Sequence, residues 1–397
     1  MKLTIKRYIT FFVAFMLSLP VVQAGITELD RRGSVPRAPL DTPEGLSCDL
    51  PQRWMTRVNQ PYPRSPLVVS RDRVYTSSDR VYALDKATGK ELWRFTPHGD
   101  FIYEDVFNGN GITVVKLDGD VLYFGGWQKA LYALDAQTGK ELWNVPLERG
   151  MLESIEFDKE RVYVSNSRKA FAINKRDGSL VWSFDLKRIE GEFHAPRLAD
   201  GKLFVLSGQV LYALDARTGQ EVWTYSPDIE QKTPEYPKFV YGPIPHIYKN
   251  QIIVIDADKN IVAVDVSTGK EVWRADGKPI AFGVYMTTTP EDKLALFTGS
   301  TLGQFNVSAQ KMDWWYRPMF SGKGRPVAFY KNAVIFGTDA EHVYAIDRNT
   351  GDEVFRFAFD ENTQGVRTVV VDGDQLYFLG GNGGVYAYDL KCPQLTP

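Results

Sequence analysis

The chain has 397 residues, of which 44% are hydrophobic and 24% charged, a composition typical of a folded globular protein. This excludes a disordered chain and a small domain held together by disulfides. Lys and Arg number 47 against 49 Asp and Glu, with no run of like charges, so we expect no nucleic-acid partner.

Residues 1–24 have the pattern of an export signal. Three basic residues precede the apolar run 9–20, and Val22-Gln23-Ala24 places small residues where a signal peptidase cleaves. The run is short for the ~20 residues that span a bilayer, so we expect cleavage, with retention as an anchor as the alternative. This predicts a periplasmic protein whose mature chain has no transmembrane segment.

Residues 25–47 follow the signal peptide and contain Arg31, Arg32 and several prolines. We expect a flexible leader, which could serve as a docking peptide. The first cysteine is Cys48, so none directly follows the apolar run, and we expect no lipid anchor at the N-terminus.

One repeated segment dominates the chain after residue 50. Residues 81–93 read VYALDKATGKELW, and the Asp or Asn of this pattern recurs at intervals of 39 to 50 residues. The later copies lie at 131–143, 170–182, 211–223, 261–273, 302–314 and 343–355, with a shortened copy at 385–389. A unit of this length that cannot bury both of its faces alone is typical of a propeller blade.

The first unit shows how each blade is expected to fold. Alternating apolar and polar residues predict strands at 65–69, 73–77, 80–85 and 91–95. In the turn before the last strand, Asp85 can accept hydrogen bonds from backbone N–H groups further along. Gly89 can adopt the positive φ that reverses the chain.

The copies predict an eight-bladed all-β propeller of four-stranded antiparallel blades. The last copy lacks a fourth strand, whereas Trp54 lies 39 residues before Trp93, on the period of the repeat. We therefore expect the N-terminal strand to complete the last blade, with the propeller spanning 48–392 and a short tail at 393–397. Cys48 and Cys392 flank the place of the missing turn, which predicts a disulfide.

The repeated positions are expected to hold the blades together. The Trp falls eight residues after the Asp, on the outer strand, where its ring can pack against the next blade. Trp127 and Trp315 are left for other roles. The predicted structural positions are Trp54, Trp93, Trp143, Trp182, Trp223, Trp273, Trp314, Phe355, Asp85, Asp135, Asp215, Asp265, Asp347, Gly89, Gly139, Gly178, Gly219, Gly269 and Gly351.

These motifs resemble the pyrroloquinoline quinone (PQQ)-like eight-bladed propeller family. Its docking motif Ala-x-Asp-x-x-Thr-Gly-x-x-x-Trp is matched at 83–93 and again at 133–143, 213–223 and 263–273. The third copy is weaker, and the sixth departs most, with Gln304, Ala309 and Gln310 at motif positions. In size and compact blades the chain is similar to the BamB-like branch of outer-membrane assembly scaffolds. These motifs indicate the fold rather than the function, because they hold the blades together.

The resemblance also implies an enzymatic alternative, a PQQ-dependent dehydrogenase with PQQ and Ca²⁺ on the axis. Many such enzymes carry an adjacent pair of cysteines beside the cofactor, and Cys48 and Cys392 are the only cysteines here. The long loops that hold the family's catalytic residues are also few in this chain. We therefore expect no catalytic residues and neither PQQ nor Ca²⁺.

A histidine metal site is not expected either. His98, His194, His246 and His342 should lie on one face of the propeller, but they belong to different blades and have no partner at the spacing of metal ligands. We interpret them as solvated loop residues.

Two insertions, at 96–111 and 226–245, are the strongest functional candidates. Both leave an outer strand, so both should rise from one face, and both mix aromatic and charged residues as partner-binding loops do. Simple packing over the axis is the alternative. The candidate partner-binding residues are Phe101, Tyr103, Trp127, Tyr236, Phe239, Tyr241, Arg317 and Arg325, the last two from a basic loop on the same face.

The sequence thus favours a monomeric periplasmic propeller that binds other proteins. By resemblance, its setting would be outer-membrane protein assembly or envelope biogenesis. The alternatives are a PQQ-dependent dehydrogenase and a propeller that binds a small ligand on its axis.

Overall fold

The structure is a computed structural model. It describes residues 48, 50–59, 66–98, 111–126, 130–147, 152, 154–166, 168–186, 195–207, 210–228, 245–278, 284–298, 301–318, 326–339, 342–358, 364–392 and 395. The candidate residues at positions 101, 103, 127, 236, 239, 241 and 325, and His194, lie outside these ranges. Within them, every regular element is a strand, and no helix is long and apolar enough to cross a membrane.

The strands are short and follow the predicted order. In the first unit they begin slightly later than predicted at two places, at Leu67 and Val81. The bounds are β1 Gln52–Arg57, β2 Leu67–Val69, β3 Arg73–Ser77, β4 Val81–Asp85, β5 Glu91–Phe95, β6 Ile112–Asp118, β7 Val121–Gly126, β8 Ala130–Asp135, β9 Glu141–Pro146, β10 Ile155–Phe157, β11 Arg161–Ser165, β12 Lys169–Asn174, β13 Leu180–Asp185, β14 Arg197–Ala199, β15 Lys202–Ser207, β16 Val210–Asp215, β17 Glu221–Tyr225, β18 His246–Tyr248, β19 Gln251–Ile255, β20 Asn260–Asp265, β21 Glu271–Asp276, β22 Tyr285–Thr288, β23 Leu294–Thr298, β24 Thr301–Asn306, β25 Lys311–Tyr316, β26 Ala328–Tyr330, β27 Ala333–Gly337, β28 His342–Asp347, β29 Glu353–Ala358, β30 Val366–Asp372, β31 Gln375–Gly380 and β32 Gly384–Asp389.

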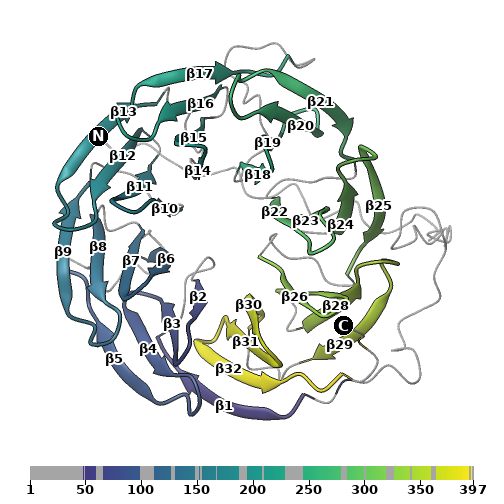
Figure 1. Ribbon diagram of the computed structural model, residues 1–397. Coiled ribbons are helices and arrows are strands. Elements are labelled where there is room, and N and C mark those ends of the chain that lie inside the picture. Colours follow the sequence, from purple (N-terminus) through teal and green to yellow (C-terminus); the bar gives the residue numbers. More distant parts are fainter. Residues whose placement is uncertain are drawn as a thin grey trace, which may run out of the picture.

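The described strands form eight four-stranded antiparallel sheets arranged as blades around a central axis (Figure 1). Blades 1 to 7 take their strands in chain order, from β2–β5 to β26–β29. The eighth has the order β1-β32-β31-β30, with Trp54 paired to Ala387. The predicted eight-bladed fold and its closure by the N-terminal strand are therefore confirmed.

Antiparallel order gives the propeller two different faces. The turn face carries the hairpins between first and second strands and the Asp-to-Gly turns between third and fourth strands. The loop face carries the connections from each blade to the next and the turns between second and third strands. Both predicted insertions leave the loop face, after β5 and after β17.

The Asp-to-Gly turn is built as its chemistry dictates. Asp85 Oδ1 accepts hydrogen bonds from Thr88 N at 2.8 Å and Thr88 Oγ1 at 2.7 Å, and these bonds hold the pKa of that carboxyl below its usual value. Gly89 has a φ of 73°, in the left-handed region that favours glycine. Asp135, Asp215 and Asp265 accept the same pair of bonds from a Thr, and Asp347 accepts one from Thr350 N.

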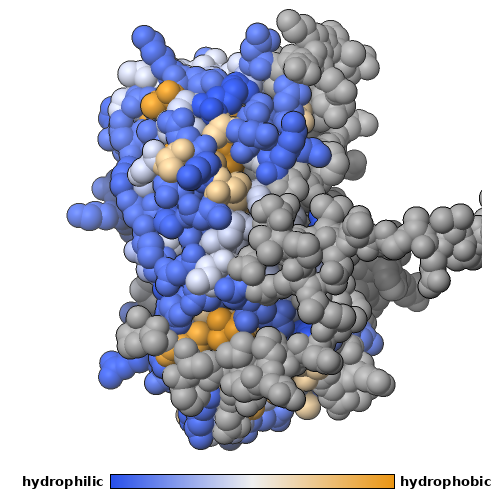
Figure 2. Space-filling model, turned by 90° about the vertical axis from the view of Figure 1, so that its right-hand side faces the viewer, coloured by the Kyte–Doolittle hydropathy of each residue, from blue (hydrophilic) through white to orange (hydrophobic). Residues whose placement is uncertain are grey.

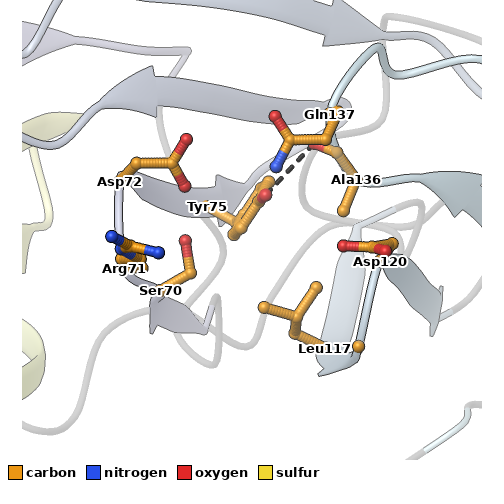
Figure 3. A pocket seen from close by; sticks show the side chains of 9 residues that line it. Ser70, Arg71, Asp72, Tyr75, Leu117, Asp120, Ala136 and Gln137 are labelled. Carbon is orange, nitrogen blue, oxygen red and sulfur yellow. Dashed lines mark hydrogen bonds between the residues drawn. The ribbon is translucent and has the colours of Figure 1, made fainter.

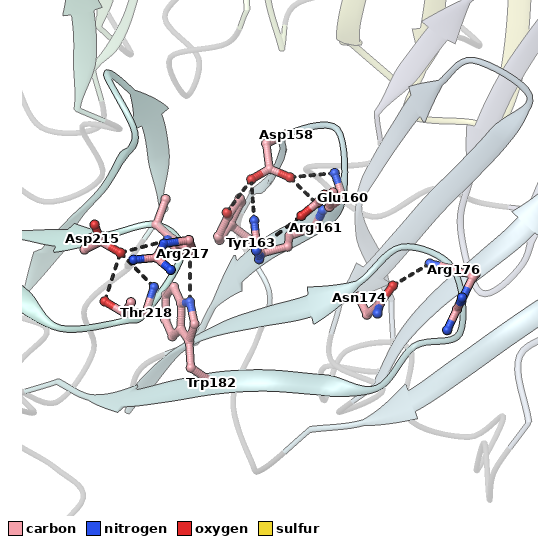
Figure 4. A network of polar contacts seen from close by, with 11 residues as sticks. Asp158, Glu160, Arg161, Tyr163, Asn174, Arg176, Trp182, Asp215, Arg217 and Thr218 are labelled. Carbon is pink, nitrogen blue, oxygen red and sulfur yellow. Dashed lines mark hydrogen bonds and ion pairs between the residues drawn. The ribbon is translucent and has the colours of Figure 1, made fainter.

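Six turns receive the outer-strand Trp of the preceding blade. Trp182 Nε1 donates to Ala216 O at 2.9 Å, beside the turn that begins at Asp215 (Figure 4). The Trp182 ring lies so close to Gly219 that a β-carbon there would overlap it. The same contacts join Trp54 to Gly89, Trp93 to Gly139, Trp143 to Gly178, Trp223 to Gly269 and Trp314 to Gly351.

Two of the seams between blades differ from this arrangement. Trp273 faces a turn with Gln310 in place of Gly, and its Nε1 donates instead to Gln251 Oε1 of its own blade at 3.0 Å. Phe355 of blade 7 faces blade 8, which has no Asp-to-Gly turn. There the predicted Cys48–Cys392 disulfide is present, and Phe355 and Cys392 belong to one buried apolar cluster.

The core is divided among the seams rather than gathered on the axis. The described residues form eight hydrophobic clusters, each shared by two neighbouring blades. Trp315 is 9% exposed and belongs to the cluster between blades 5 and 6, so the sequence expectation that left it for another role was wrong. Its neighbour Gly303 provides the space that the ring needs.

Candidate functional site

The innermost strands place four polar side chains at equivalent positions around the axis. Lys116, Glu156, Arg197 and His246 pair across their blades with Tyr123, Tyr163, Phe204 and Ile253, at the same register in four consecutive blades. We call these four residues the axial belt. Blades 1, 7 and 8 have Val68, Ala328 and Val370 at this position, so one side of the axial wall is polar and the other apolar.

Three residues of the axial belt, Lys116, Glu156 and Arg197, are joined by ion pairs, and His246 instead contacts the next blade. Glu156 Oε1 lies 3.2 Å from Lys116 Nζ and 3.0 Å from Arg197 Nη1, and Arg197 also donates to Ser154 Oγ at 3.1 Å. His246 Nε2 lies 2.7 Å from Thr288 Oγ1 of the next blade. Two cations thus share one carboxylate, which leaves this side of the axis positively charged.

Burial shapes the electrostatics of the axial belt. It lowers the pKa of the Arg197 guanidinium, and Glu156 opposes that shift by stabilising the charged form. Burial and, to a lesser extent, the charge of Arg197 lower the pKa of His246 from 6.5 to about 4. His246 is therefore neutral near pH 7, and it is a half-buried strand residue rather than the solvated loop residue expected from sequence.

A second feature is a cleft of about 580 Å³ on the turn face between blades 1 and 2. Tyr75 lies at its base and donates through Oη to Ala136 O at 3.1 Å (Figure 3). Ser70 and Asp72 approach from one blade, and Leu117 and Asp120 from the other (Figure 3).

The cleft exists because two facing residues are small. In blades 1 and 3 the residue after the turn Asp is Lys86 or Lys175, and each reaches back to an aspartate of the preceding blade, Asp372 or Asp118. In blade 2 this residue is Ala136, and Ser70 occupies the facing position. The Lys–Asp pairs therefore fill the seams between blades 8 and 1 and between blades 2 and 3. At the seam between blades 1 and 2, the short side chains of Ala136 and Ser70 leave the cleft open.

Ion pairs join neighbouring blades at several seams of the turn face. Besides the two Lys–Asp pairs, Arg348 pairs with Glu291 and Lys249 with Asp292, each across a seam. Within blade 3, the Asp158 carboxylate accepts a hydrogen bond from Tyr163 Oη at 2.7 Å and contacts Arg161 at 3.2 Å (Figure 4). These groups already have partners within the chain.

The loop face carries the described part of the predicted partner-binding set. Arg317 is exposed directly after β25, at the start of the connection to blade 7. His98 follows β5, is 72% exposed, and has Nε2 3.0 Å from a Glu141 carboxylate oxygen. His98, His246 and His342 lie in blades 1, 5 and 7, and no three His, Cys, Asp or Glu side chains of the described part are grouped as metal ligands.

Sequence reasoning missed the axial belt and the cleft. The signal for the belt was a charged residue in short first strands where other copies have Val or Ala. The signal for the cleft was that Ala136 and Ser70 occupy the repeat positions that Lys86 and Asp372 occupy at the seam between blades 8 and 1. Both signals require comparison of the repeats position by position.

The family described as outer membrane protein assembly factor BamB matches residues 51–126, 77–187, 127–279 and 292–392. The chain belongs to this family. The crystal structure of BamB from Moraxella catarrhalis superimposes with a TM-score of 0.68 at 18% identity and covers 86% of this chain and all of that one.

Enzymes share the same fold. Quinohemoprotein alcohol dehydrogenase from Comamonas testosteroni superimposes with a TM-score of 0.66 at 17% identity, covering 88% of this chain and 78% of that chain. In sequence it is 36% identical over 108 residues, which are 26% of this chain and 15% of the enzyme. Tetrathionate hydrolase from Acidithiobacillus ferrooxidans is 22% identical over 83% of this chain and 59% of its own length. The chain thus spans only part of these curated relatives.

Proposed function

We propose that this protein is a non-enzymatic scaffold that binds other proteins in the bacterial envelope, in the assembly of outer-membrane proteins. The observation that carries the proposal is the BamB family match, which extends over most of the propeller. A fold shared with enzymes does not decide function, so the argument depends on the sites.

The arrangement of charged and aromatic residues favours the loop face as the partner-binding face. Several charged groups of the turn face are paired within the chain, as Lys86 is with Asp372 across a seam, and these groups are less available to a partner. The connections of the loop face carry the aromatic residues Tyr103 and Tyr241 in sequence, a residue type that tends to carry interface energy.

A periplasmic location is part of this proposal. Residues 1–24 have the pattern of a signal peptide, and the Cys48–Cys392 disulfide is the kind of bond that persists in oxidising compartments.

The PQQ-dependent alternative has little support in the arrangement of the cysteines. Cys48 and Cys392 are bonded to each other next to β1, the outer strand of blade 8, and not on an inner strand beside the axis. The described residues therefore do not fit the adjacent cysteine pair that many of these enzymes have.

A small-ligand function is the second candidate, and the axial belt favours it. Arg197 and Lys116 share Glu156 and leave a positive charge beside apolar Val68 and Val370. An organic anion would suit that combination.

Two measurements separate these functions. Purification from the native envelope with identification of co-purifying proteins should give an outer-membrane assembly protein, and direct binding of that protein should then be measurable. Calorimetry with PQQ and Ca²⁺, and dye reduction with alcohols or aldoses, should give no signal. Micromolar PQQ binding with turnover of an alcohol would overturn the scaffold proposal.

A further inference from the structure

Arg197 is anchored at the axis through one nitrogen of its guanidinium. It lies in β14, the innermost strand of blade 4, and its Nη1 donates to Glu156 Oε1 at 3.0 Å, Ser154 Oγ at 3.1 Å and Pro196 O at 3.1 Å. Glu156 lies in the innermost strand of blade 3, and Ser154 comes two residues before it. Two neighbouring blades thus fix the position of this guanidinium.

The other edge of the same guanidinium is unoccupied. Among the described residues, Arg197 makes its hydrogen bonds through Nη1 alone, and its Nε and Nη2 are not enclosed by protein. These two nitrogens are therefore open to solvent, and 26% of the side chain is exposed. Nε and Nη2 present two parallel N–H groups, which is the arrangement that binds both oxygens of one carboxylate.

The axial belt carries one net positive charge. Lys116 and Arg197 are cationic and share the single carboxylate of Glu156. Burial and the charge of Arg197 lower the pKa of His246 to about 4, so its imidazole is neutral near pH 7. A ligand with one negative charge therefore completes the balance. A dianion, or a tricarboxylate such as PQQ, would leave charge without a partner in a partly desolvated place.

The axial wall opposite Arg197 is apolar. In the ring of eight blades, blade 4 faces blade 8, which has Val370 at the same register position, and blades 7 and 1 beside it have Ala328 and Val68 there. A ligand held at Arg197 by its carboxylate therefore extends from the polar side of the axis toward the apolar side. The rim differs: Figure 2 views the side of β21, β25 and β29, where hydrophilic residues cover most of the described surface and hydrophobic ones form small separate groups.

We propose that the axis binds a small organic monocarboxylate with an apolar body, and that Nε and Nη2 of Arg197 bind its carboxylate. Glu156 and Ser154 hold the guanidinium in position through Nη1, which leaves the other edge free for the ligand. Lys116 keeps the belt positive, because it shares the carboxylate of Glu156 with Arg197.

This inference rests on the second candidate function, the binding of a small ligand on the axis, and it names the chemical class of that ligand. It requires no protein partner. Failure of the scaffold function in a partner-binding measurement would therefore leave carboxylate binding unchanged, and absence of carboxylate binding would leave the scaffold function intact.

Fluorine NMR of the purified protein near pH 7, with 4-fluorobenzoate as the probe, tests the ligand class. The wild type should bind the probe saturably at millimolar concentration or below, whereas the uncharged 4-fluorobenzamide should not bind. Sulfate, a dianion, should displace the probe only weakly. Fluoroacetate has the same charge as the probe but almost no apolar body, so it should bind several-fold more weakly. Absence of saturable binding, equal binding of the amide or of fluoroacetate, or displacement by an equal concentration of sulfate would contradict the proposal.

Variants of Arg197 test the site itself. R197Q should weaken binding of 4-fluorobenzoate by about tenfold or more, because it removes a charge-assisted pair of hydrogen bonds. R197K keeps the charge beside Glu156 but has no parallel N–H groups, so it should weaken binding several-fold, and it decides the question if R197Q does not fold. The matched control is R176Q, which removes an arginine whose side chain is 87% exposed on the turn face, and it should bind as the wild type does. Wild-type affinity in R197K, or an equal loss in R176Q, would overturn the assignment to Arg197.

Discussion

The indole ring of Trp54 lies against Gly89, where a β-carbon would overlap it, and Trp54 Nε1 donates to Lys86 O at 3.0 Å. Trp54 comes from the N-terminal strand β1, which completes blade 8, whereas Gly89 belongs to blade 1. The seam that closes the ring is thus built like the seams between blades that are consecutive in the chain.

This contact predicts a specific loss of stability for G89A. Gly89 and Gly201 both have positive φ, 73° and 65°, so alanine strains the backbone at both positions. Only the β-carbon at position 89 also meets the Trp54 ring, since nothing lies within 4 Å at Gly201. We expect G89A to lose about 1–3 kcal/mol more than G201A in urea unfolding. Equal losses would show that the ring does not require glycine.

The disulfide predicts that removing its two cysteines will lower the stability of the protein. Cys48 and Cys392 are separated by 344 residues, and their bond ties β1 to the end of the chain. The double variant C48S/C392S should be less stable by up to about 5 kcal/mol, and by less where β1 pairing already restrains the ends. Thiol titration of the denatured, unreduced protein should find no free thiol. Two free thiols would contradict the bond.

The half-buried imidazole of His246 predicts that stability depends on pH. Its pKa is about 4 in the folded protein against 6.5 ordinarily, so between these values the unfolded chain binds more protons. The free energy of unfolding therefore falls as pH is lowered from 6.5 to 4, and His246 contributes fully only above that window.

Replacing His246 removes this contribution. In H246Q the loss of stability between pH 6.5 and 4 should be smaller than in wild type by up to about 3 kcal/mol, at roughly 1.4 kcal/mol per pKa unit. H98Q, which changes a side chain that is 72% exposed, is the control and should follow the wild type. Parallel wild-type and H246Q profiles would refute the assignment.

The cleft between blades 1 and 2 predicts that an added ion pair will stabilise the protein. S70D together with A136K reproduces the arrangement of Lys86 and Asp372, whose basic side chain is 18% exposed. A double-mutant cycle should give a favourable coupling of about 0.5–1 kcal/mol, typical of a partly exposed ion pair. Zero coupling would mean that the seams are not equivalent.

Much of the fold could be predicted because the repeat is local. Asp85, Thr88 and Gly89 determine a turn by hydrogen bonding and backbone freedom alone, and Trp54 falls on the same period. The disulfide could be predicted because Cys48 and Cys392 flank the position of the turn that blade 8 lacks. These features require only short-range chemistry and counting.

Other features depend on contacts between blades, which period alone does not reveal. Trp315 is buried because Gly303 leaves room for its ring, and Trp273 turns to Gln251 because Gln310 replaces a glycine. His246 is half-buried because its strand faces the axis beside Arg197. In each case a neighbouring residue determined the outcome, and only the three-dimensional arrangement identifies that neighbour.

The central claim is that the loop face binds the partner, and one comparison of two variants tests it most directly. Binding of the envelope partner identified by co-purification should be measured for Y103A/Y241A, in the connections that follow β5 and β17 in sequence, and for K90A/R217A, on the turn face. We predict that the loop-face variant loses roughly 2 kcal/mol or more of binding free energy with nearly unchanged thermal stability, whereas the turn-face variant binds as the wild type does. Undiminished binding by Y103A/Y241A together with loss in K90A/R217A would contradict the account.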